Sequence, residues 1–265
     1  MRLEEMAIAY QMDGQGVPLV FLHQVATDQR LWRRQRAYFH RRYRVITVDM
    51  LGHGAVAWPE VELSIGQAGR RVRQLLERLG TGPAFVIGVS MGAAVAMRVA
   101  LEAPELVLGL VLVSPWSHAN EHVHSLVDRL FRLAEAADMT TYMQVFLRYG
   151  FPAADLERFG PEIDWLRAVA LEQDARAVAY AWAACLAVEL GGELRGIGAP
   201  SLVIAGFNDF LTPPYLARAV AAELPVVELE VWEETGHFPF LEDPLRFNRR
   251  LEAFILHCLS RADRQ

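Results

Sequence analysis

Short, almost continuously apolar runs alternate with helix-like segments along most of this chain, and this alternation restricts the fold more than any other feature. The apolar runs are Pro18–Leu22, Val45–Val48, Ala84–Val89, Val107–Val113, Ser201–Ala205 and Val226–Trp232. Such runs are typical of parallel strands that are buried on both faces. Helical patterns lie between them at Ile65–Leu79, Met91–Glu102, Tyr215–Glu223 and Leu245–Leu259. The sequence therefore predicts a doubly wound α/β domain with a mostly parallel sheet.

The alternation is interrupted once, between about Ser117 and Arg195. Apolar residues recur there at helical spacing, and no segment reads convincingly as a strand. A helical insertion between two strands of one sheet is the simplest explanation. We expect residues 1–116 and 196–265 to form the core. Residues 117–195 are expected to form a helical cap, not an independent domain, over the carboxyl edge of the sheet, where ligands bind in open α/β folds.

The segment Gly88–Gly92 reads G-V-S-M-G and stands directly between a predicted strand and a predicted helix. Ser90 must then lie on a tight turn, and the flanking glycines leave room for its strained backbone. Its hydroxyl would project from the sheet edge, near the positive end of the following helix. This context favours a nucleophilic serine over an ordinary Gly-Ser turn.

A serine hydroxyl is a weak nucleophile until a base takes its proton. Of the eight histidines, His237 is the best candidate for that base, because it follows the last predicted strand in a sheet-edge loop. His40 and His257 stand in charged, helix-like surroundings and are interpreted as surface residues. The alternative for His237 is a loop histidine that caps a backbone group.

Asp209 follows the strand Ser201–Ala205 and is the candidate for orienting the imidazole and stabilising its charged form. The position after an earlier strand, Ser114–Trp116, offers no carboxylate. The chain order Ser, Asp, His agrees with a G-x-S-x-G nucleophile on this type of sheet. Alternatively, Asp209 caps a helix that begins near Pro213.

These features together resemble the α/β-hydrolase superfamily over essentially the whole chain. Within it, the sequence is most similar to the branch of the 3-oxoadipate enol-lactonases and the non-haem bromoperoxidases. The stretches that carry this resemblance are Thr27-Asp28 with Arg30 and Trp32, Asp49–Gly54, Gly88–Gly92, Leu211–Pro214 and Gly236-His237.

The resemblance also implies an oxyanion hole made of two backbone N–H groups, those of Met91 and Val25. The superfamily commonly has His-Gly in the second loop, whereas this chain has His23-Gln24. We expect His23, Gln24 and Trp116 to contact the substrate. Trp116 directly follows a strand and would wall an apolar acyl or ring pocket; the alternative is a core tryptophan under the insertion.

His118, His122 and His124 near the start of the insertion could be interpreted as metal ligands. His118 and His122 would share a helix face if that segment is helical. No carboxylate or cysteine constellation accompanies them, so a pocket lining or plain surface is favoured and no metal is predicted. The chain contains no lysine, which excludes Schiff-base chemistry, a pyridoxal-phosphate anchor and a phosphate-loop lysine. We predict no cofactor.

Charge and composition limit the partners. The net charge of -6 argues against general nucleic-acid binding. The basic segment Arg30–Arg44 could bind phosphate but is more typical of a solvated helix face. Cys185 and Cys258 imply no disulfide framework. Met1–Tyr10 lacks the apolar block of a signal peptide, and no apolar stretch is long enough to span a bilayer. The sequence thus predicts a cytoplasmic enzyme without a membrane partner, and it does not predict the oligomeric state.

The predicted function is that of a cofactor-free serine hydrolase. It would cleave a small to medium hydrophobic ester or lactone through an acyl-serine intermediate. The same three residues could instead serve perhydrolase or haloperoxidase-type chemistry, or carbon–carbon hydrolysis or lyase action on a polyketide-like substrate. A small-molecule receptor and a non-catalytic scaffold are further alternatives on the same fold.

Overall fold

The computed structural model describes residues 8–58, 62–152 and 156–262. Within these residues, seven strands form one sheet in the order β1-β3-β2-β4-β5-β6-β7. β1 runs antiparallel to β3, and every other neighbouring pair is parallel. The predicted, mostly parallel sheet is therefore confirmed. The strands are β1 (Ala9–Asp13), β2 (Pro18–Leu22), β3 (Arg44–Asp49), β4 (Ala84–Val89), β5 (Val107–Val113), β6 (Ser201–Gly206) and β7 (Val227–Trp232).

Strand β1 was not predicted from the sequence. It lies at the edge of the sheet formed by the described strands, where it pairs with β3, and its three central residues are exposed. An edge strand without a fully covered face has no continuous apolar run, so the signal that marked the other strands is missing. The remaining strands begin and end within one residue of the predicted bounds.

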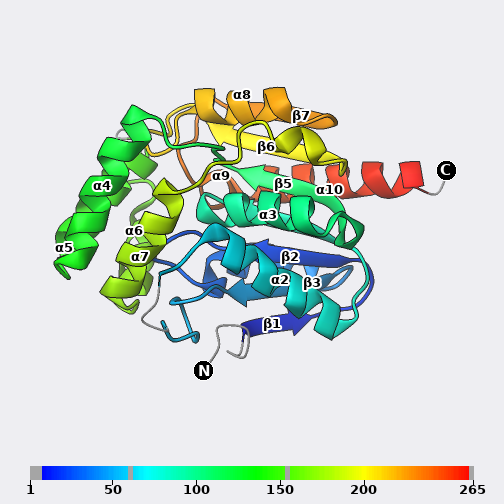
Figure 1. Cartoon of the computed structure of the whole chain (residues 1–265), viewed down its shortest axis with the longest axis horizontal. Helices are drawn as coiled ribbons and strands as arrows, with labels where there is room; N and C mark the ends of the chain where they lie inside the picture. Colours follow the sequence, from blue (N-terminus) through cyan, green and yellow to red (C-terminus); the bar gives the residue numbers. More distant parts are fainter. Residues whose placement is uncertain (1–7, 59–61, 153–155, 263–265) are drawn as a thin grey trace.

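Helices cover both faces of the sheet (Figure 1). Helices α2 (Ile65–Leu79) and α3 (Met91–Glu102) pack together on one face, whereas α1 (Arg33–Phe39) and α10 (Pro244–Ala262) lie on the other. Helix α8 (Pro214–Glu223) packs on β6 and β7, and the short α9 (Pro239–Glu242) precedes α10.

Helix α2 illustrates how the sequence fixes the ends of these elements. Its N-terminus carries a capping box, in which the hydroxyl of Ser64 accepts from the N–H of Gln67 and the Gln67 side chain accepts from the N–H of Ser64. The helix ends at Gly80, whose φ of 56° is left-handed and favours glycine.

Residues 117–195, which we call the cap segment, lie between β5 and β6, and their described part contains four α-helices. They are α4 (Glu121–Glu135), α5 (Met139–Gly150), α6 (Gly160–Leu171) and α7 (Ala175–Leu186). Figure 1 shows them grouped beyond the carboxyl ends of the central strands. The two ends of the segment meet, because His118 and Glu189 form an isolated antiparallel bridge and the N–H of Leu190 donates to the carbonyl of Ser117 at 2.8 Å.

The basic segment Arg30–Arg44 contacts this cap segment. Arg34 forms an ion pair with Glu162, and the Arg33 guanidinium lies 3.6 Å from the centre of the Trp165 ring. Both partners belong to α6. The segment was expected to be a solvated helix face. Two of its arginines instead contact α6, so the segment also joins a helix of the cap segment to the core.

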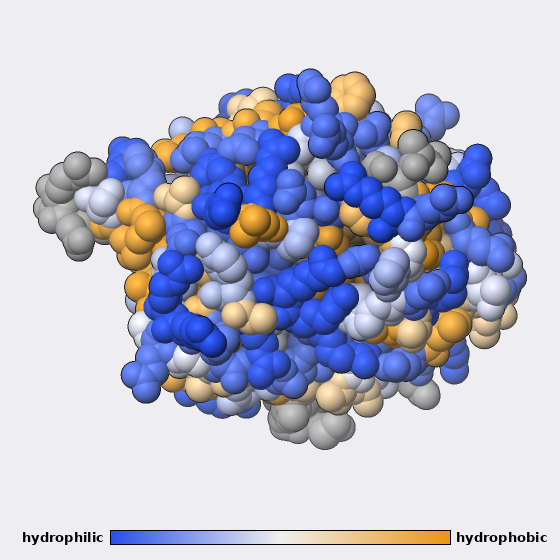
Figure 2. All heavy atoms as spheres, turned by 180° about the vertical axis from the view of Figure 1, so that it is seen from behind, coloured by the Kyte–Doolittle hydropathy of each residue, from blue (hydrophilic) through white to orange (hydrophobic). Residues whose placement is uncertain are grey.

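The surface opposite the view of Figure 1, which carries α1 and α10, is mostly hydrophilic, and its apolar residues form separate small patches (Figure 2). Among the described residues, no helix is both long and apolar enough to cross a membrane. Residues 1–7 belong to the stretch for which a signal peptide was not predicted, and they lie outside the described residues.

Candidate active site

Ser90 occupies the strained turn between β4 and α3. Its backbone has φ 54° and ψ −121°, a conformation that costs a non-glycine residue about 1–3 kcal/mol. The turn is held on both sides. The N–H of Ser90 donates to the carbonyl of Val113 at 3.0 Å, and its carbonyl accepts from the N–H of Ala93 at 2.8 Å. Ser90 thus stands at the carboxyl edge of the sheet, as its sequence context predicted.

Gly88 and Gly92, on either side of Ser90, are required because neighbouring backbone atoms lie too close to leave room for a side chain. A Cβ atom on Gly88 would lie 2.1 Å from the carbonyl oxygen of Gly92, and one on Gly92 would lie 2.3 Å from that of Leu22. Real Cβ atoms do not approach backbone oxygens so closely. The G-x-S-x-G spacing therefore lets the start of α3 lie against both β4 and the end of β2.

Asp209 and His237, which are 28 residues apart in sequence, meet at the same edge. The Nδ1 atom of His237 lies 2.8 Å from Oδ2 of Asp209, and the two side chains are 1% and 0% exposed. Because an ionised carboxylate can only accept, Nδ1 carries the ring proton and Nε2 is the acceptor nitrogen. Nε2 is buried and has no hydrogen-bond partner among the described residues.

The Asp209 carboxylate is itself fixed by its own loop. Oδ1 accepts from the N–H groups of Leu211 and Thr212, each at 2.9 Å. The Thr212 hydroxyl lies 2.9 Å from Oδ2 and 3.2 Å from Nδ1 of His237. Asp209 does not cap α8, whose N-cap residue is Pro213. Thr212 was not assigned a role from the sequence, although it stands in a stretch that carries the family resemblance.

His237 is held in place through its main chain. Its N–H donates to the carbonyl of Gly150 at 2.7 Å, and its carbonyl accepts from the Ser114 hydroxyl at 3.2 Å. The rings of Phe146 and Phe238 meet the imidazole edge to face, at 81° and 89°. The end of α5 in the cap segment and the end of β5 in the core therefore jointly fix this loop.

Ser90 and His237 line one narrow cavity between core and cap segment. The other lining residues are mainly apolar and come from both parts of the chain: Trp116, Val123, Leu126, Val127, Trp182, Leu211 and Thr212. The cavity has space for about one water molecule. No hydrogen bond joins Ser90 and His237 in the described structure, and such contacts are commonly loose before a substrate binds.

Trp116 is 2% exposed and lines this cavity, and its indole Nε1 has no hydrogen-bond partner within the described residues. Gln24 is 1% exposed, and both polar atoms of its side-chain amide are likewise without partners there. An unsatisfied buried polar group costs about 1–3 kcal/mol. These two side chains are therefore poorly satisfied by the protein alone.

The two N–H groups predicted to form an oxyanion hole are also unpaired. Val25 and Met91 are buried, and neither N–H donates to another residue in the part of the chain that the structure covers. Met91 opens α3, where the first N–H groups of a helix have no partner within the helix. Two buried donors are thus free on the residue after Ser90 and in the loop after β2.

His23 and His53 hold the loop that contains Val25. Nε2 of His23 accepts from the N–H of Met50 at 2.9 Å, and Nδ1 donates to the carbonyl of Gln24 at 2.7 Å. Nε2 of His53 accepts from the N–H of Ala26 at 3.2 Å. His23 is 0% exposed with both nitrogens engaged on the backbone, so its position does not favour the predicted substrate contact.

Acidification is expected to destabilise the folded protein through these two imidazoles. Burial lowers the pKa of His23 to about 4, and burial together with the neighbouring His23 lowers the pKa of His53 to about 3. Between pH 6.5 and about 4, the unfolded chain binds protons at both residues that the folded chain does not bind. The free energy of unfolding therefore falls as the pH falls through this window. His23 alone contributes about 3 kcal/mol of this loss.

Urea unfolding curves recorded between pH 7 and pH 4.5 measure this effect. The variant His53→Gln should show a shallower decline than the parent chain, because one of the two groups no longer titrates. The carboxyl of Asp28 does not interfere, since its pKa lies below the ordinary value of 3.8. Equal slopes for parent and variant would contradict the assignment.

The three histidines of the cap segment do not come together. His118 precedes α4 rather than sharing a helix face with His122, because the helix begins at Glu121. The Nε2 atom of His122 lies 2.9 Å from the carbonyl oxygen of Phe210. Over residues 8–58, 62–152 and 156–262, no group of three or more His, Cys, Asp or Glu side chains could hold a metal ion.

Comparison with known proteins extends the resemblance. A family model described as the alpha/beta hydrolase fold matches residues 17–244. The chain is 30% identical over 273 residues to a candidate non-heme bromoperoxidase, BpoC, of Mycobacterium tuberculosis. That alignment covers 93% of this chain and 97% of the relative. It is 29% identical over 255 residues to the pimeloyl-[acyl-carrier protein] methyl ester esterase of Nitrosomonas europaea, with 91% and 96% covered.

Among solved structures, the enol-lactonase from Burkholderia xenovorans LB400 is similar to this chain with a TM-score of 0.86. The match covers 94% of this chain and 96% of that one, at 23% sequence identity. At that identity the likeness concerns the fold. The family model and the sequence relatives confirm the predicted superfamily, and the bromoperoxidase relative is one of the two kinds of enzyme that the sequence most resembles.

Proposed function

The chain belongs to the α/β-hydrolase family of enzymes, and on this premise we propose that it is a serine hydrolase with Ser90, Asp209 and His237 as its catalytic triad. The observation that carries the proposal is the orientation of His237. Asp209 holds the proton on Nδ1, which leaves the basic Nε2 without a partner in a residue that lines the same cavity as Ser90.

The proposed reaction is acyl transfer in two halves. Nε2 of His237 takes the proton of the Ser90 hydroxyl while the Ser90 oxygen attacks the substrate carbonyl carbon. The N–H groups of Val25 and Met91 stabilise the resulting oxyanion. When the intermediate collapses, the leaving group takes the proton from Nε2. Water then gives a proton to Nε2 and attacks the acyl carbon. When this second intermediate collapses, the bond from the acyl carbon to the Ser90 oxygen breaks and that oxygen takes the proton from Nε2, which releases the acid and restores Ser90.

The lining of the cavity favours a carboxylic ester or lactone with a small to medium apolar acyl or ring portion. Because the cavity has space for about one water molecule, the cap segment has to move away from the core to admit it. The walls of the cavity are mainly aliphatic and aromatic, and they include Val123, Leu126 and Trp182 of the cap segment. Within this site, we propose that the unpaired amide of Gln24 and the indole N–H of Trp116 hydrogen-bond to polar atoms of the bound substrate. His23 acts on the loop rather than on the substrate.

Labelling with a fluorophosphonate tests the proposal. We expect stoichiometric modification at Ser90, identified by mass spectrometry of the digested protein, and protection by small hydrophobic esters and lactones. Ser125, an exposed serine on α4, is the internal control and should stay unmodified. A folded protein that reacts at neither serine, or whose labelling no ester or lactone reduces, would remove the proposal. Slow single turnover would instead point to a receptor.

One second candidate is favoured by the likeness to the candidate non-heme bromoperoxidase. Here hydrogen peroxide replaces water in the second half-reaction, so that the acyl group leaves Ser90 as a peroxy acid. Bromide oxidation in the presence of ester and hydrogen peroxide measures this activity. It should be absent in Ser90→Ala if the acyl-serine route is used.

A further inference from the structure

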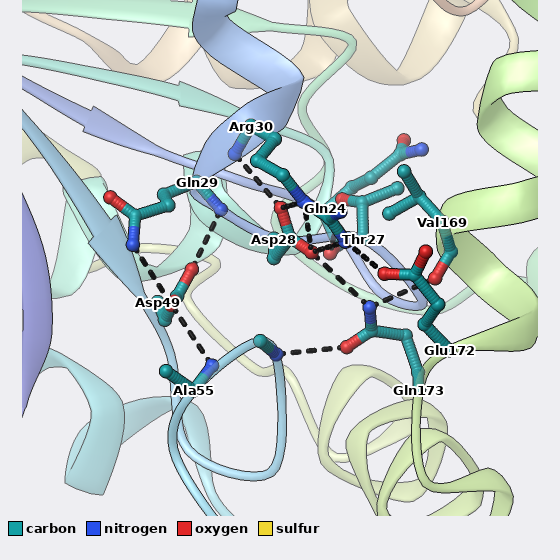
Figure 3. Close-up of polar contacts among 11 residues, drawn as sticks. Gln24, Thr27, Asp28, Gln29, Arg30, Asp49, Ala55, Val169, Glu172 and Gln173 are labelled. Carbon is teal, nitrogen blue, oxygen red and sulfur yellow. Dashed lines mark hydrogen bonds and ion pairs between the residues drawn. The ribbon is translucent and has the colours of Figure 1, made fainter.

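A single glutamine of the cap segment bridges two core loops, one that contains Val25 and Asp28 and one that contains Gly54 and Ala55. Gln173 follows α6 and is 9% exposed. Its Oε1 accepts from the N–H of Gly54 at 2.9 Å, and its Nε2 lies 3.3 Å from Oδ2 of Asp28 and 2.9 Å from the carbonyl oxygen of Val169 (Figure 3). Both ends of the amide are therefore engaged, and each reaches a different loop.

On the first side, Asp28 is a buried anion. Asp28 is the N-cap of the short helix η2 (Gln29–Trp32), because its Oδ1 accepts from the N–H of Arg30 at 2.9 Å. Its Oδ2 forms an ion pair with the Arg30 guanidinium at 2.6 Å. Burial alone would raise the pKa of Asp28, but the hydrogen bonds from Arg30 outweigh it and hold the pKa below the ordinary value. Arg30 in turn pairs with Glu172, next to Gln173.

On the second side, Asp49 joins the same two loops from the core. Its Oδ1 accepts from the N–H of Gln29 at 2.8 Å, and its Oδ2 accepts from the N–H of Ala55 at 3.1 Å (Figure 3). Gly54 lies so close that a Cβ atom there would stand 2.4 Å from Cγ of Asp49. Residues 28–29 and 54–55 are thus joined twice, by Asp49 of the core and by Gln173 of the cap segment.

Val25 lies between two such anchors. Before Asp28, the loop is held by His23 on the Gln24 carbonyl and by His53 on the N–H of Ala26, a residue in the left-handed region with φ 60°. Three residues after Val25, the Asp28 side chain contacts Gln173 of the cap segment. The N–H of Val25 belongs to the same planar peptide as the Gln24 carbonyl, which accepts from Nδ1 of His23 and, at 3.1 Å, from the Thr27 hydroxyl. Thr27 directly precedes Asp28, so this peptide is tied to the anchor that Gln173 completes.

We propose that Gln173 is a positioning residue, which makes the geometry of the oxyanion hole depend on the docking of the cap segment. The inference rests on the proposed function, because it assigns the N–H of Val25 to the oxyanion. It also explains the arginine segment, in which Arg30, Arg33 and Arg34 all contact the stretch 162–172 that leads to Gln173. Misplacement of a catalytic group by about 1 Å can cost about 100-fold in rate.

The variant Gln173→Leu keeps a similar side-chain volume and removes all three hydrogen bonds of the Gln173 amide, to Gly54, Asp28 and Val169. Its kcat should fall by about 10- to 100-fold, with KM changed by less than about threefold. A trifluoromethyl ketone forms an anionic adduct with a catalytic serine, so its inhibition constant should rise by the same factor as kcat/KM falls. A purely structural glutamine would lower the melting temperature and leave both ratios unchanged.

The variant Gln173→Glu provides a second measurement on the same position. It keeps an acceptor for the N–H of Gly54 but places a second carboxylate beside Asp28. Protonation of the introduced carboxylate restores a donor, so the kcat of this variant relative to the parent should rise as the pH is lowered. Gln173→Leu should show no such relative gain. Arg167→Ala, which removes an exposed i,i+3 ion pair with Asp164 on α6, is the matched control and should keep the parent kcat.

Each outcome decides the proposal. Parent-like kcat and inhibitor binding in folded Gln173→Leu, or a change in KM alone, would overturn it. If Gln173→Leu does not fold, a pH profile of Gln173→Glu parallel to that of the parent would overturn it instead. Failure of the proposed function is a different result, because the parent chain would then show no ester hydrolysis and no labelling at Ser90.

Discussion

Replacement of Ser90 by alanine should lower kcat for hydrolysis of p-nitrophenyl acetate by about 10⁴- to 10⁶-fold. This corresponds to about 5–8 kcal/mol of activation free energy. The loss is large because the three proposed catalytic residues act as a unit. Without the Ser90 oxygen, Nε2 of His237 has no proton to take, and no acyl-enzyme forms. What remains is the contribution of binding and of the oxyanion donors, Val25 and Met91.

The fold should tolerate this substitution, which makes the kinetic result easy to interpret. The backbone strain at Ser90 is unchanged by alanine, and its hydroxyl forms no hydrogen bond to the described residues whose loss would destabilise the turn. The melting temperature should therefore stay within a few degrees of the parent value. Ser125→Ala, on the exposed face of α4, is the control and should retain full activity. Ser90→Ala protein that turns over as fast as the parent would rule out Ser90 as the nucleophile.

The parts of the fold that the sequence predicts are those with a local signal. Strands such as β4 are buried on both faces, so their apolar runs are visible without any knowledge of their neighbours. Edge strand β1 lacks that signal because its three central residues are exposed, so it has no continuous apolar run. The same reasoning explains why Ser90, Asp209 and His237 can be found: each lies within five residues of the end of a strand, at the edge where a parallel sheet collects its functional residues.

Residues that act through distant partners have no comparable signal. Gln173 lies 145 residues from Asp28 and 119 from Gly54, and nothing in its local sequence distinguishes it from a solvated glutamine after a helix. His23 was expected to contact the substrate. Its contact with the N–H of Met50, which fixes the ring on the backbone, is visible only when β2 and β3 are side by side.

The second large effect is expected for Asp209→Asn, which should lower kcat by about 10⁴-fold while the protein stays folded. Oδ1 of Asp209 accepts from the N–H groups of Leu211 and Thr212, so the amide oxygen of asparagine will stay in that place. Its NH₂ group then faces Nδ1 of His237. An NH₂ group only donates, so Nδ1 becomes the acceptor and the ring proton moves to Nε2. His237 then presents an N–H to Ser90 and cannot remove its proton.

Comparison with Asp209→Ala distinguishes two roles of Asp209: fixing the tautomer of His237, and accepting from the N–H groups of its own loop. Alanine removes the acceptor of two buried N–H groups as well as the partner of His237, so this variant should lose both activity and about 1–3 kcal/mol or more of stability. Asparagine should lose activity alone, and ¹⁵N NMR of His237 should place the proton on Nε2.

A second group near Nδ1 is the Thr212 hydroxyl at 3.2 Å, which can accept from Nδ1–H and preserve some of the productive tautomer. The residual kcat of Asp209→Asn should therefore fall further in the double variant with Thr212→Val. An asparagine variant within tenfold of the parent kcat would show that His237 does not need the Asp209 carboxylate.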